Sequence, residues 1–443
     1  MDKVHLISLG CPKNRVDSEV LLGTLASEGF VLASGAEEAE VIVVNTCAFI
    51  RAAVEESIET ILELGQYKKK GRLRYLVVTG CLPQRYGEAI AQEITEVDFW
   101  AGTGDFLAVP RWLKEGGPHI VIGPPRYLYD HRTPRVLANT SYSAYVKIAE
   151  GCDHGCTFCL IPRLRGRYRS RLIGSVIAEV QQLAGMGVVE INLIAQDSTA
   201  YGRDLDGSAG LEDLLERVGT IEGIQWIRLL YAYPRPDAIT SEVLEILATH
   251  EKMCPYLDIP IQHINNDILK RMGRTSTGPE VRELVLRIRR DYPQIALRTT
   301  VMVGFPGEGD AEFEELVLFV KEAEFTHLGV FIYSPEEGTR AYRMKGRPPR
   351  DVIDARAERI MLVQQEISLE KNRRLLGTSL PVLVEGGVEQ RSDLFKARAS
   401  FQAPDIDGVV LVSGNELHPG DMVCALITDA APYDLLGEVA DQH

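Results

Sequence analysis

The sequence lacks the long apolar runs that a membrane protein needs. None of its apolar stretches approaches the roughly 18 consecutive residues of a membrane-spanning helix. The first residues, "MDKVHLISLGC", contain an apolar part that is too short for a secretory signal, and no small-residue cleavage site follows it. These two absences predict a cytoplasmic protein that does not engage a membrane.

An excess of positive charge is also missing. The formal net charge is −15 over 443 residues, and the pI is near 5.2. A protein whose affinity came mainly from phosphate contacts would usually be basic. The acidic balance therefore favours a basic partner over a nucleic acid. The length is sufficient for about two to four domains.

A disulfide framework is a third feature that we do not expect. In a cytoplasmic chain of this size, cysteines more often serve metal binding or catalysis. Cys254 and Cys424 lie in or beside predicted strands, and we expect them to be core residues. The other six cysteines are Cys11, Cys47, Cys81, Cys152, Cys156 and Cys159.

Three similar units occupy the N-terminal part of the chain. The apolar segments "VHLISLGC", "VIVVNTC" and "YLVVTGC" each predict a strand that ends at a cysteine, and a helical pattern follows each strand. We expect Asp17 or Ser18 to cap the first helix. The cysteines are spaced by about one βαβ unit, which predicts a parallel α/β sheet domain over residues 1–135.

Cys11, Cys47 and Cys81 stand at the ends of these three predicted strands. Because the carboxyl ends of parallel strands lie along one edge of a sheet, three separate loops can bring three thiolates to one point. The alternative is that they are unrelated buried cysteines. The repeated context, in which SLGC, VNTC and VTGC resemble one another, argues against that alternative.

The rest of the chain predicts two further domains. A proline-rich segment from Thr103 to Ser141 predicts a crossover connection. Six strand patterns then alternate with amphipathic helices, which predicts an open partial (β/α) TIM-like barrel over residues 136–375, since a complete barrel of this type typically takes about 250 residues. Five short strand patterns with turn residues between them predict a small OB-like five-stranded β-barrel over residues 376–443.

Cys152, Cys156 and Cys159 form a C-x3-C-x2-C cluster just after the first strand of the predicted partial barrel. One interpretation is that the three thiols are buried and pack as small hydrophobic groups. The polar residues around them argue against this interpretation. A second is a closed zinc site with His154 as the fourth ligand. A third is an iron–sulfur cluster held by three thiolates, with one iron left open to bind a small molecule.

Polar residues and glycines follow other strands of the same predicted barrel. In such barrels the loops at the carboxyl ends of the strands form the active site, so these residues predict a pocket beside the cysteines. Taken singly, each has the alternative of a capping or turn role. The residues are Gln196, Asp197, Gln262, His263, Gly304, Gly307, Glu308, Tyr333 and Ser334.

The motif "GCDHGCTFC" on a partial barrel resembles the radical S-adenosylmethionine (radical SAM) enzymes. With "SLGCPKNRVDSE", "VGFPGE" and "YSPEEGTRAY", the resemblance extends over essentially the whole chain to the methylthiotransferases of that group. It implies a central radical SAM barrel and a C-terminal barrel of the TRAM type. It also implies an enzyme in which one SAM donates a methyl group, a second SAM supplies a radical, and CH3–S replaces a hydrogen.

The resemblance also assigns roles to residues of this chain. It implies that Cys152, Cys156 and Cys159 are catalytic and hold a 4Fe-4S cluster that binds SAM. It implies that Cys11, Cys47 and Cys81 hold an auxiliary 4Fe-4S cluster that handles sulfur. A reducing partner such as flavodoxin or ferredoxin is expected. The residues expected to form the SAM pocket are Gln196, Asp197, Gln262, Gly304, Gly307 and Glu308.

The family divides into enzymes that modify a tRNA adenosine and enzymes that modify an aspartate of ribosomal small-subunit protein twelve. From Ser379 to His443 the chain has three basic and eleven acidic residues, which disfavours RNA and favours docking of a basic ribosomal protein. "GCPKNRVDSE", "QAPDIDGVV" and "YDLLGE" also resemble the ribosomal-protein branch. The basic run from Gln66 to Arg74 is the contrary feature, and we expect it to be a solvated loop.

The expected function is therefore methylthiolation of the aspartate β-carbon in that ribosomal protein, by a monomer. Two alternatives remain open. One is methylthiolation of tRNA. The other is an iron–sulfur module for RNA binding or electron transfer that performs no radical chemistry.

Overall fold

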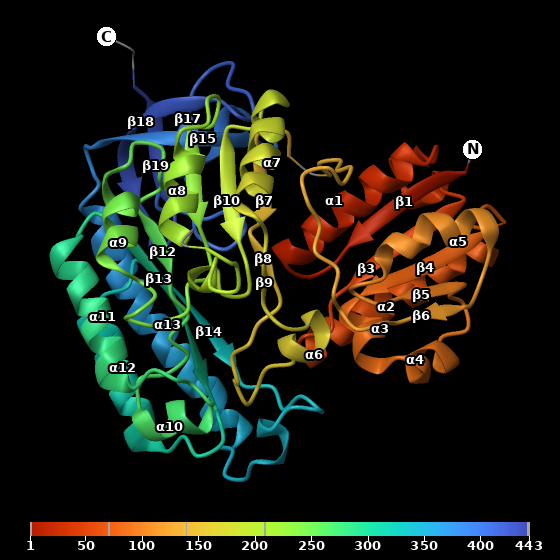
Figure 1. The fold of residues 1–443 in the computed structure, drawn as a ribbon. Helices are drawn as coiled ribbons and strands as arrows, with labels where there is room; N and C mark the ends of the chain where they lie inside the picture. Colours follow the sequence, from red (N-terminus) through yellow and green to blue (C-terminus); the bar gives the residue numbers. More distant parts are fainter. Residues whose placement is uncertain (1, 70, 139, 208–209, 441–443) are drawn as a thin grey trace.

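The computed structural model describes residues 2–69, 71–138, 140–207 and 210–440. Its elements form an N-terminal sheet domain, a central open barrel and a C-terminal closed barrel, as Figure 1 shows from red to blue. These are the fold class and the order of units that the sequence predicts. Within the described residues, no helix has the length and apolar character needed to cross a bilayer.

The N-terminal domain is a six-stranded parallel sheet with the order β2-β1-β3-β4-β5-β6. The three predicted strands are its centre: β1 (Lys3–Ser8), β3 (Val41–Thr46) and β4 (Tyr75–Gly80). The additional strands are only two or three residues long, too short to leave a periodic pattern: β2 (Val31–Leu32), β5 (Phe99–Ala101) and β6 (Ile120–Val121). The helices of this domain are α1 (Pro12–Ser27), α2 (Arg51–Lys69), α3 (Cys81–Tyr86), α4 (Glu88–Glu93) and α5 (Val109–Glu115).

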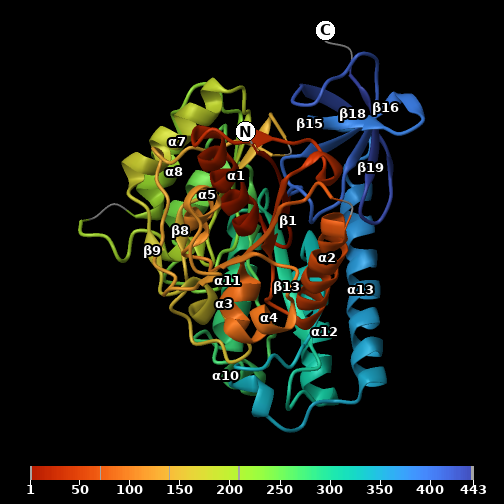
Figure 2. The same ribbon diagram turned by 90° about the vertical axis from the view of Figure 1, so that its right-hand side faces the viewer.

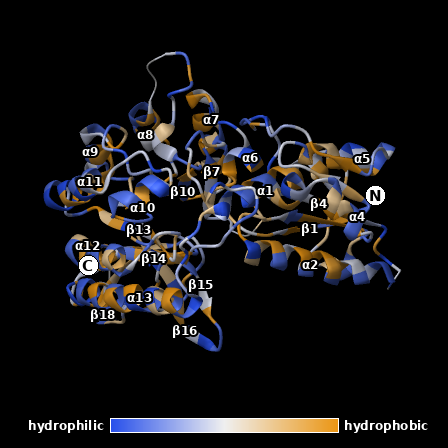
Figure 3. Cartoon of the chain, turned by 90° about the horizontal axis from the view of Figure 1, so that it is seen from below, coloured by the Kyte–Doolittle hydropathy of each residue, from blue (hydrophilic) through white to orange (hydrophobic). Residues whose placement is uncertain are grey.

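Hydropathy explains how this sheet is covered. β3 and β4 are buried on both faces, as expected for near-continuous apolar strands in a parallel sheet. α2 carries apolar and polar residues on different sides, which is visible in Figure 3. The sequence analysis expects the basic run from Gln66 to Arg74 to be a loop. In the structure this run is helical as far as Lys69, the last residue of α2.

α1 begins earlier than the sequence predicts. Pro12 occupies its first turn and Cys11 is the N-cap residue, so the expectation that Asp17 or Ser18 caps this helix is wrong. Proline favours this position because its fixed φ suits the first turn and the missing N–H has no helical partner there. Asp17 and Ser18 are instead buried within the helix.

The central domain has six parallel strands in sequence order around an open barrel. They form two three-stranded sheets, β11-β10-β7 and β12-β13-β14, which approach each other at the bridge between Ile227 and Met253. The strands are β7 (Ser143–Lys147), β10 (Glu190–Ile194), β11 (Trp226–Leu229), β12 (Tyr256–Asp258), β13 (Ala296–Val303) and β14 (His327–Ile332).

Helices cover the convex side of this barrel and pack on it through the largest apolar core. These helices are α7 (Ile173–Gly185), α8 (Leu211–Gly219), α9 (Ser241–Thr249), α11 (Gly278–Asp291), α12 (Asp310–Ala323) and α13 (Arg350–Arg373). α13 is long and runs from the lower end of the domain up to the C-terminal barrel (Figure 2). Shorter elements near the cysteine loop are β8 (Ala149–Glu150), β9 (Arg169–Ser170), α6 (Ile161–Arg165) and α10 (Asn266–Arg271).

The concave side of the barrel is filled by other domains. Val16 and Val20 of α1 belong to the same buried apolar cluster as Tyr145, Trp226 and Tyr256 on the barrel strands. Leu383 and Ala403 of the C-terminal domain also belong to it. The three domains therefore share one core, in which α1 packs against the open barrel.

The C-terminal domain is a closed five-stranded barrel with the order β15-β16-β17-β19-β18, as predicted. Cys424 is exposed on β18, so the expectation that it is a core residue is wrong, whereas Cys254 is fully buried. Ala425 and Ile427 of β18 point inward, and alternation along a strand turns Cys424 outward. The strands are β15 (Ser379–Val388), β16 (Arg391–Ala399), β17 (Val410–Ser413), β18 (Met422–Ala430) and β19 (Leu435–Val439).

A buried charge cluster holds the two barrels together. Arg398 of β16 donates to both carboxylate oxygens of Glu190 on β10, at 3.0 and 2.7 Å, and Arg228 donates to the same carboxylate at 3.2 Å. Burial by itself would raise the pKa of Glu190, but the two guanidinium groups outweigh it and lower the pKa to about 2. Glu190 is therefore ionised, and its charge depends on these partners.

We expect Arg398→Ala to lower the free energy of unfolding by about 3–5 kcal/mol, because it leaves a buried carboxylate with half of its cationic partners. Arg391→Ala, on the same strand, is the matched control. Arg391 pairs with Asp393 at 3.0 Å where both side chains are exposed, so its loss should cost about 0–1 kcal/mol. Guanidinium unfolding of both variants measures the difference, and equal losses would contradict the role given to Arg398.

Candidate functional site

The first cysteine triad lies at the carboxyl edge of the N-terminal sheet. Cys11, Cys47 and Cys81 follow β1, β3 and β4, which are adjacent and parallel, and the register pairs Ser8 with Asn45 and Thr46 with Gly80. The three strand ends are thus level with one another. The cysteines lie close enough for their charges to interact. The structure therefore brings together the three residues that the sequence analysis grouped.

Two glycines make this close approach feasible. Gly10 has a φ of +89° and Gly80 a φ of +99°, conformations that L side chains rarely adopt. A Cβ on Gly10 would lie 2.5 Å from the Cβ of Cys47, and one on Gly80 would lie 2.4 Å from the Oδ1 of Asn45. The glycines of SLGC and VTGC are therefore required by the packing of these loops against the NTC loop.

Two buried asparagines fix the loops in place. The Nδ2 of Asn14 donates to the carbonyl oxygens of Leu9 and Thr46, both at 2.9 Å. The Nδ2 of Asn45 donates to the carbonyl oxygen of Asn14 and to the Oγ of Ser18, both at 2.9 Å. Side chains of α1 and β3 thereby tie the first two cysteine loops to each other. No signal in the sequence separates these asparagines from ordinary turn residues.

The environment of this triad suits metal-bound thiolates. Burial raises the pKa of Cys81 to about 12, although the nearby charge of Arg165 opposes that shift, and burial also raises the pKa of Cys47. Such thiols stay protonated at neutral pH unless a metal replaces the proton. Cys11 is exposed, so the triad is open on that side.

The second triad lies in the loop between β8 and α6. The N–H groups of His154 and Ile161 donate to the sulfurs of Cys152 and Cys159, at 3.5 and 3.4 Å. The side chain of Arg274 lies 3.8 Å from the sulfur of Cys156. Hydrogen bonds to sulfur are among the groups that set the properties of iron–sulfur sites. Burial raises the pKa of Cys152 and of Cys159 to about 12, so these thiols also need a metal to ionise.

His154 does not join these cysteines. Its Nε2 lies 2.7 Å from the Oδ2 of Asp197, and its ring stacks on Tyr233 with 3.7 Å between the centroids. Among the described residues, no group of three or more histidines, cysteines or acidic residues is arranged to hold a single metal ion. In a 4Fe-4S cluster each thiolate binds a different iron, so its ligands need not converge on one point. The contacts of His154 with Asp197 and Tyr233 thus argue against a closed zinc site in which His154 is the fourth ligand.

Gln196 and Asp197 lie beside the second triad, as the sequence analysis expects. The Nε2 of Gln196 donates to Glu150 at 2.6 Å, and its Oε1 is buried with no partner. Asp197 and Cys152 line a cavity of about 300 Å³ whose wall also includes Arg203 and Arg235. Buried polar atoms without partners normally mark a place for a ligand or ordered water. The cavity therefore fits a small polar molecule next to Cys152.

Gly304, Gly307 and Glu308, which belong to "VGFPGE", lie in a different environment from Gln196 and Asp197. Glu308 accepts hydrogen bonds from the N–H of Gly304 at 3.1 Å and from Arg356 of α13 at 2.7 Å. Gly304 and Gly307 lie against the side chains of Ile353 and Arg271. In the structure these three residues form a turn that packs on neighbouring helices. Their contact with SAM stays a prediction.

This turn nevertheless reaches the cysteine loop. The ring of Phe158, between Cys156 and Cys159, lies edge-on to Phe305 with 6.2 Å between the centroids. Phe305 in turn packs against Tyr333, whose hydroxyl is buried without a partner. The Nε2 of His263 is likewise buried without a hydrogen bond, but it lies 3.7 Å from the Oε2 of Glu308. The Tyr333 hydroxyl therefore adds to the buried polar groups without a hydrogen-bond partner in this part of the barrel.

Gln262 and Ser334 complete the predicted set. Gln262 has a φ of +69°, an uncommon conformation for a residue other than glycine, and its N–H donates to Thr300 at 2.9 Å. Strained backbone of this kind clusters at functional sites. Ser334 donates to Glu336 at 2.5 Å, so it serves the domain interface described next.

The sequence analysis missed the charged residues that join the two triads. Asp17 of α1 is ion-paired with Lys147 of β7 and, at 2.5 Å, with Arg165 of α6. Glu150 lies 2.7 Å from Lys147 and 3.4 Å from Arg165. Burial alone would raise the pKa of Glu150, but Lys147 and Arg165 outweigh it and lower the pKa to about 2. We call these four residues the bridging network.

The bridging network touches both cysteine sites. Glu150 precedes Cys152 by two residues, and Arg165 lies close enough to Cys81 to influence its pKa. Leu160, next to Cys159, packs in the same apolar core as Cys81. The two triads therefore face each other across the interface between the N-terminal domain and the barrel.

A second missed contact lies on the same interface. Glu336, in the loop after β14, accepts a hydrogen bond from Arg85 of α3 at 2.9 Å, and both side chains are buried. It also accepts from the N–H of Arg51 at 2.8 Å. The only available signal was the pair of glutamates in "YSPEEGTRAY", and spacing does not indicate a partner almost 300 residues away in sequence.

Comparison with protein families divides the chain in the same way. Residues 3–102 match the family described as "Uncharacterized protein family UPF0004", residues 146–320 match the Radical SAM superfamily, and residues 376–440 match the TRAM domain.

Curated relatives are similar over almost their whole length. One from Geobacter sulfurreducens is 49% identical over 99% of this chain and 98% of its own, and one from Syntrophotalea carbinolica is 48% identical over 99% and 97%. One from Sorangium cellulosum is 47% identical over 100% and 91%. Each is named ribosomal protein uS12 methylthiotransferase RimO.

Solved structures resemble this chain in fold. The radical S-adenosylmethionine methyltransferase TsrM from Kitasatospora setae, with cobalamin and a [4Fe-4S] cluster bound, aligns with a TM-score of 0.56 at 16% identity. That alignment covers 86% of this chain and 80% of TsrM. The cobalamin-dependent radical enzyme OxsB aligns with a TM-score of 0.51 at 14% identity, over 82% of this chain and 56% of OxsB.

The burial and thiol pKa values predict an order of chemical reactivity in iron-free protein. At pH 8, iodoacetamide should alkylate exposed Cys11 and Cys424 at least about tenfold faster than buried Cys81 and Cys152, because thiolate is the nucleophile. Mass spectrometry of peptides from timed samples measures the rates, and protein unfolded in urea is the control in which the four rates converge. Equal rates in the folded protein would contradict the buried placement.

Proposed function

This chain belongs to the radical SAM methylthiotransferase family, and we propose that it replaces a hydrogen on the β-carbon of an aspartate in ribosomal protein uS12 with a methylthio group. The observation that carries this proposal is the pair of cysteine triads from two domains, which face each other across the bridging network. Placing CH3–S on an unactivated carbon requires removal of a hydrogen and delivery of sulfur at the same place. Two facing sites meet that requirement.

Cys152, Cys156 and Cys159 would hold the SAM-binding 4Fe-4S cluster, and the unpaired oxygen of Gln196 and the cavity beside Asp197 support a SAM pocket there. Cys11, Cys47 and Cys81 would hold the second cluster. When bound, the clusters and two SAM molecules supply the sulfur, the methyl group and the hydrogen-abstracting radical. A low-potential donor such as flavodoxin or ferredoxin would supply the electron.

The chain's own residues orient the two sites and keep water away. The bridging network holds the loops of both triads in one buried unit, with Asp17, Glu150, Lys147 and Arg165 at most 7% exposed. Buried, mutually paired charges have fixed positions, so they orient the reacting groups without rearranging during the reaction. Apolar packing of Leu160 beside Cys81 excludes solvent on one side.

The charges of the C-terminal barrel support a protein substrate. Its three basic residues are each engaged in ion pairs: Arg391 with Asp393, and Lys396 and Arg398 with Glu385. Their charges are thus matched within this chain, and the remaining acidic residues suit a basic ribosomal protein. Two residues of the basic run from Gln66 to Arg74 are also engaged, since Lys68 pairs with Asp98 at 2.6 Å and Arg74 with Asp2 at 2.9 Å. That pairing weakens the case for tRNA.

Iron content tests the assignment of ligands. Anaerobically reconstituted protein should contain about eight irons per chain, and replacement of Cys152, Cys156 and Cys159 by alanine should leave about four. Cys254→Ala is the matched control, because Cys254 is a buried cysteine outside both triads and should not affect the count. Retention of all the iron in the triple variant, or recovery of zinc, would contradict the assignment.

The modified product tests the function. Ribosomal protein uS12 from a strain without this gene should lack one methylthio group, and the purified enzyme with SAM and reductant should add it and release 5′-deoxyadenosine. Mass spectrometry of uS12 and of bulk tRNA from the same cells makes the comparison. If the tRNA modification alone were lost, the substrate would be tRNA, and if no 5′-deoxyadenosine formed, the radical mechanism would be wrong.

A further inference from the structure

The surface beside the cysteine loop of the barrel is basic, although the chain as a whole has a net charge of −15. Residues 270–274 contain three cations and no acidic residue, and residues 338–350 contain five cations and no acidic residue. Arg350 pairs with a carboxylate of α13, and Arg274 lies 3.8 Å from the sulfur of Cys156, so a bound cluster would match its charge. The other six cations are exposed, and we call them the basic face: Lys270, Arg271, Arg340, Arg343, Lys345 and Arg347.

The cations of the basic face have no anionic partner within this chain. In the described part of the chain, no carboxylate lies within the 4.0 Å of an ion pair with any of them. Arg340 and Arg347 donate to backbone carbonyl oxygens, those of Gly155 and Tyr333. The exposed acidic residues next to these segments in sequence are fewer: Asp267, Glu337 and Asp351. Six exposed cations also outnumber the three thiolates of a filled cysteine site, so the face stays positive when that site is occupied.

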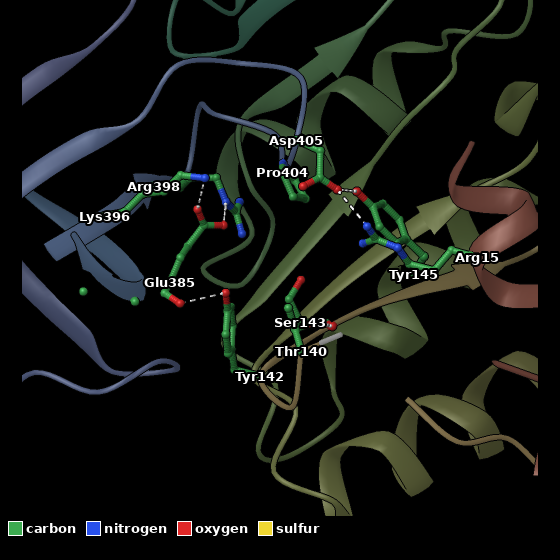
Figure 4. A pocket seen from close by; sticks show the side chains of 12 residues that line it. Arg15, Thr140, Tyr142, Ser143, Tyr145, Glu385, Lys396, Arg398, Pro404 and Asp405 are labelled. Atoms are coloured by element: carbon green, nitrogen blue, oxygen red, sulfur yellow. Dashed lines mark hydrogen bonds and ion pairs between the residues drawn. The ribbon is translucent and has the colours of Figure 1, made fainter. Parts of the chain in front are cut away.

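The cations of another polar surface are paired, by contrast. A cavity of about 290 Å³ lies between α1 and the C-terminal barrel. Figure 4 shows Arg15 directed at Asp405 and Arg398 directed at Glu385 in its wall, with distances of 3.4 and 2.6 Å. Lys396 also pairs with Glu385, at 3.2 Å. The positive charges of this cavity are matched internally, which sets the basic face apart from it.

The basic face borders the cysteine loop on two sides. Thr157 and Phe158 are the two residues inside the C-x2-C part of that loop. The N–H of Thr157 donates to the carbonyl oxygen of Met272 at 2.8 Å, and the N–H of Ala341 donates to the carbonyl oxygen of Thr157 at 2.8 Å. Phe158 packs in one small apolar cluster with Met272 and Ala341. In Figure 1 these segments lie at the lower end of the barrel, around α10 and in the loop after β14. The face is therefore fixed directly to the loop.

A different side of the loop faces the N-terminal domain. Leu160 packs in the same apolar core as Cys81, and Arg165 pairs with Asp17 of α1. The space between the two triads, where the substrate would react, is on that side. A molecule on the basic face can therefore reach the loop while uS12 is bound.

We propose that the basic face docks an acidic one-electron donor protein, an inference that rests on the proposed function. One electron leaves the reduced donor and enters the cluster on Cys152, Cys156 and Cys159, and no bond forms or breaks. Electron transfer slows steeply with distance, so the donor has to sit beside this loop. Complementary charge suits such partners, which form small and short-lived complexes. Tyr342, which is 49% exposed within the second segment, adds an aromatic contact of the kind enriched at interfaces.

A nucleic acid is the other kind of partner that a basic surface can bind. Its phosphates gain nothing from lying at the cysteine loop, whereas an electron donor must lie there. The position of the face therefore favours the donor, and RNA serves as the competing ligand in the experiment.

Binding of an acidic flavodoxin, in its oxidised form, to the reconstituted full chain tests this role. Replacement of Lys270, Arg343 and Lys345 by glutamine removes three charges whose side chains make no hydrogen bond within the described residues. This first variant should bind flavodoxin at least about tenfold more weakly at low ionic strength, because complementary charge is lost. Added salt should weaken wild-type binding and reduce the difference, since exposed charges are screened. Calorimetry measures the affinities.

The matched control replaces Arg217, Lys321 and Arg373 by glutamine. These exposed cations lie on α8, α12 and α13, and their loss should leave flavodoxin affinity as in wild type. Stopped-flow mixing with reduced flavodoxin gives a second readout, and electron transfer should be slower in the first variant alone. Dithionite, a small reductant that needs no docking surface, should reduce the clusters of all three proteins alike, which shows that the clusters are intact.

Equal flavodoxin affinity in wild type and the first variant, equal losses in both variants, or no binding by wild type would contradict the inference. Loss of binding to bulk tRNA or ribosomal RNA in the first variant, without loss of flavodoxin binding, would make the face a nucleic-acid surface and would also contradict it. If wild type modifies uS12 with dithionite while flavodoxin binding fails, the inference alone is wrong. If no reductant supports modification of uS12, the proposed function fails whatever the binding result.

Discussion

The buried ion network between α1 and the barrel is the constraint on which the rest of this structure depends. Asp17 is paired with two cations of the central domain, Lys147 and Arg165, and all three side chains are nearly inaccessible to water. A buried charge that loses its partner costs about 3–5 kcal/mol, so only an orientation that matches every charge is acceptable. The network therefore selects one docking geometry for the N-terminal domain, which apolar packing alone would not specify.

This constraint also explains why strain is tolerated near the site. Tyr231 and Gln262, at the ends of two neighbouring barrel strands, both have left-handed backbone conformations. Each such residue costs on the order of 1–3 kcal/mol and persists only where the surroundings determine it. With α1 fixed by its charges, the concave side of the barrel has little freedom to relax. The strand ends are thus held in the positions that present their side chains to the interface.

Local features of the site could be predicted from the sequence, and its long-range contacts could not. Three apolar strands ending at Cys11, Cys47 and Cys81 contain their own periodicity, so the sheet and the meeting of the cysteines follow from local pattern. The partner of Asp17 is some 130 residues away, and no spacing rule connects it to Lys147. The contacts of "VGFPGE" could not be predicted for the same reason, because its glycines lie against helices that only the tertiary structure brings near.

The packing of α1 inside the open barrel has a consequence for biosynthesis. Val16 and Val20 leave the ribosome long before Trp226 and Tyr256, which belong to the same buried apolar cluster. At about 5–20 residues per second, the roughly 200 intervening residues take on the order of 10–40 s to translate. During that interval the part of this cluster that the N-terminal domain contributes lacks its partners from the barrel. The shared core of this protein is therefore completed only after the barrel strands have been translated.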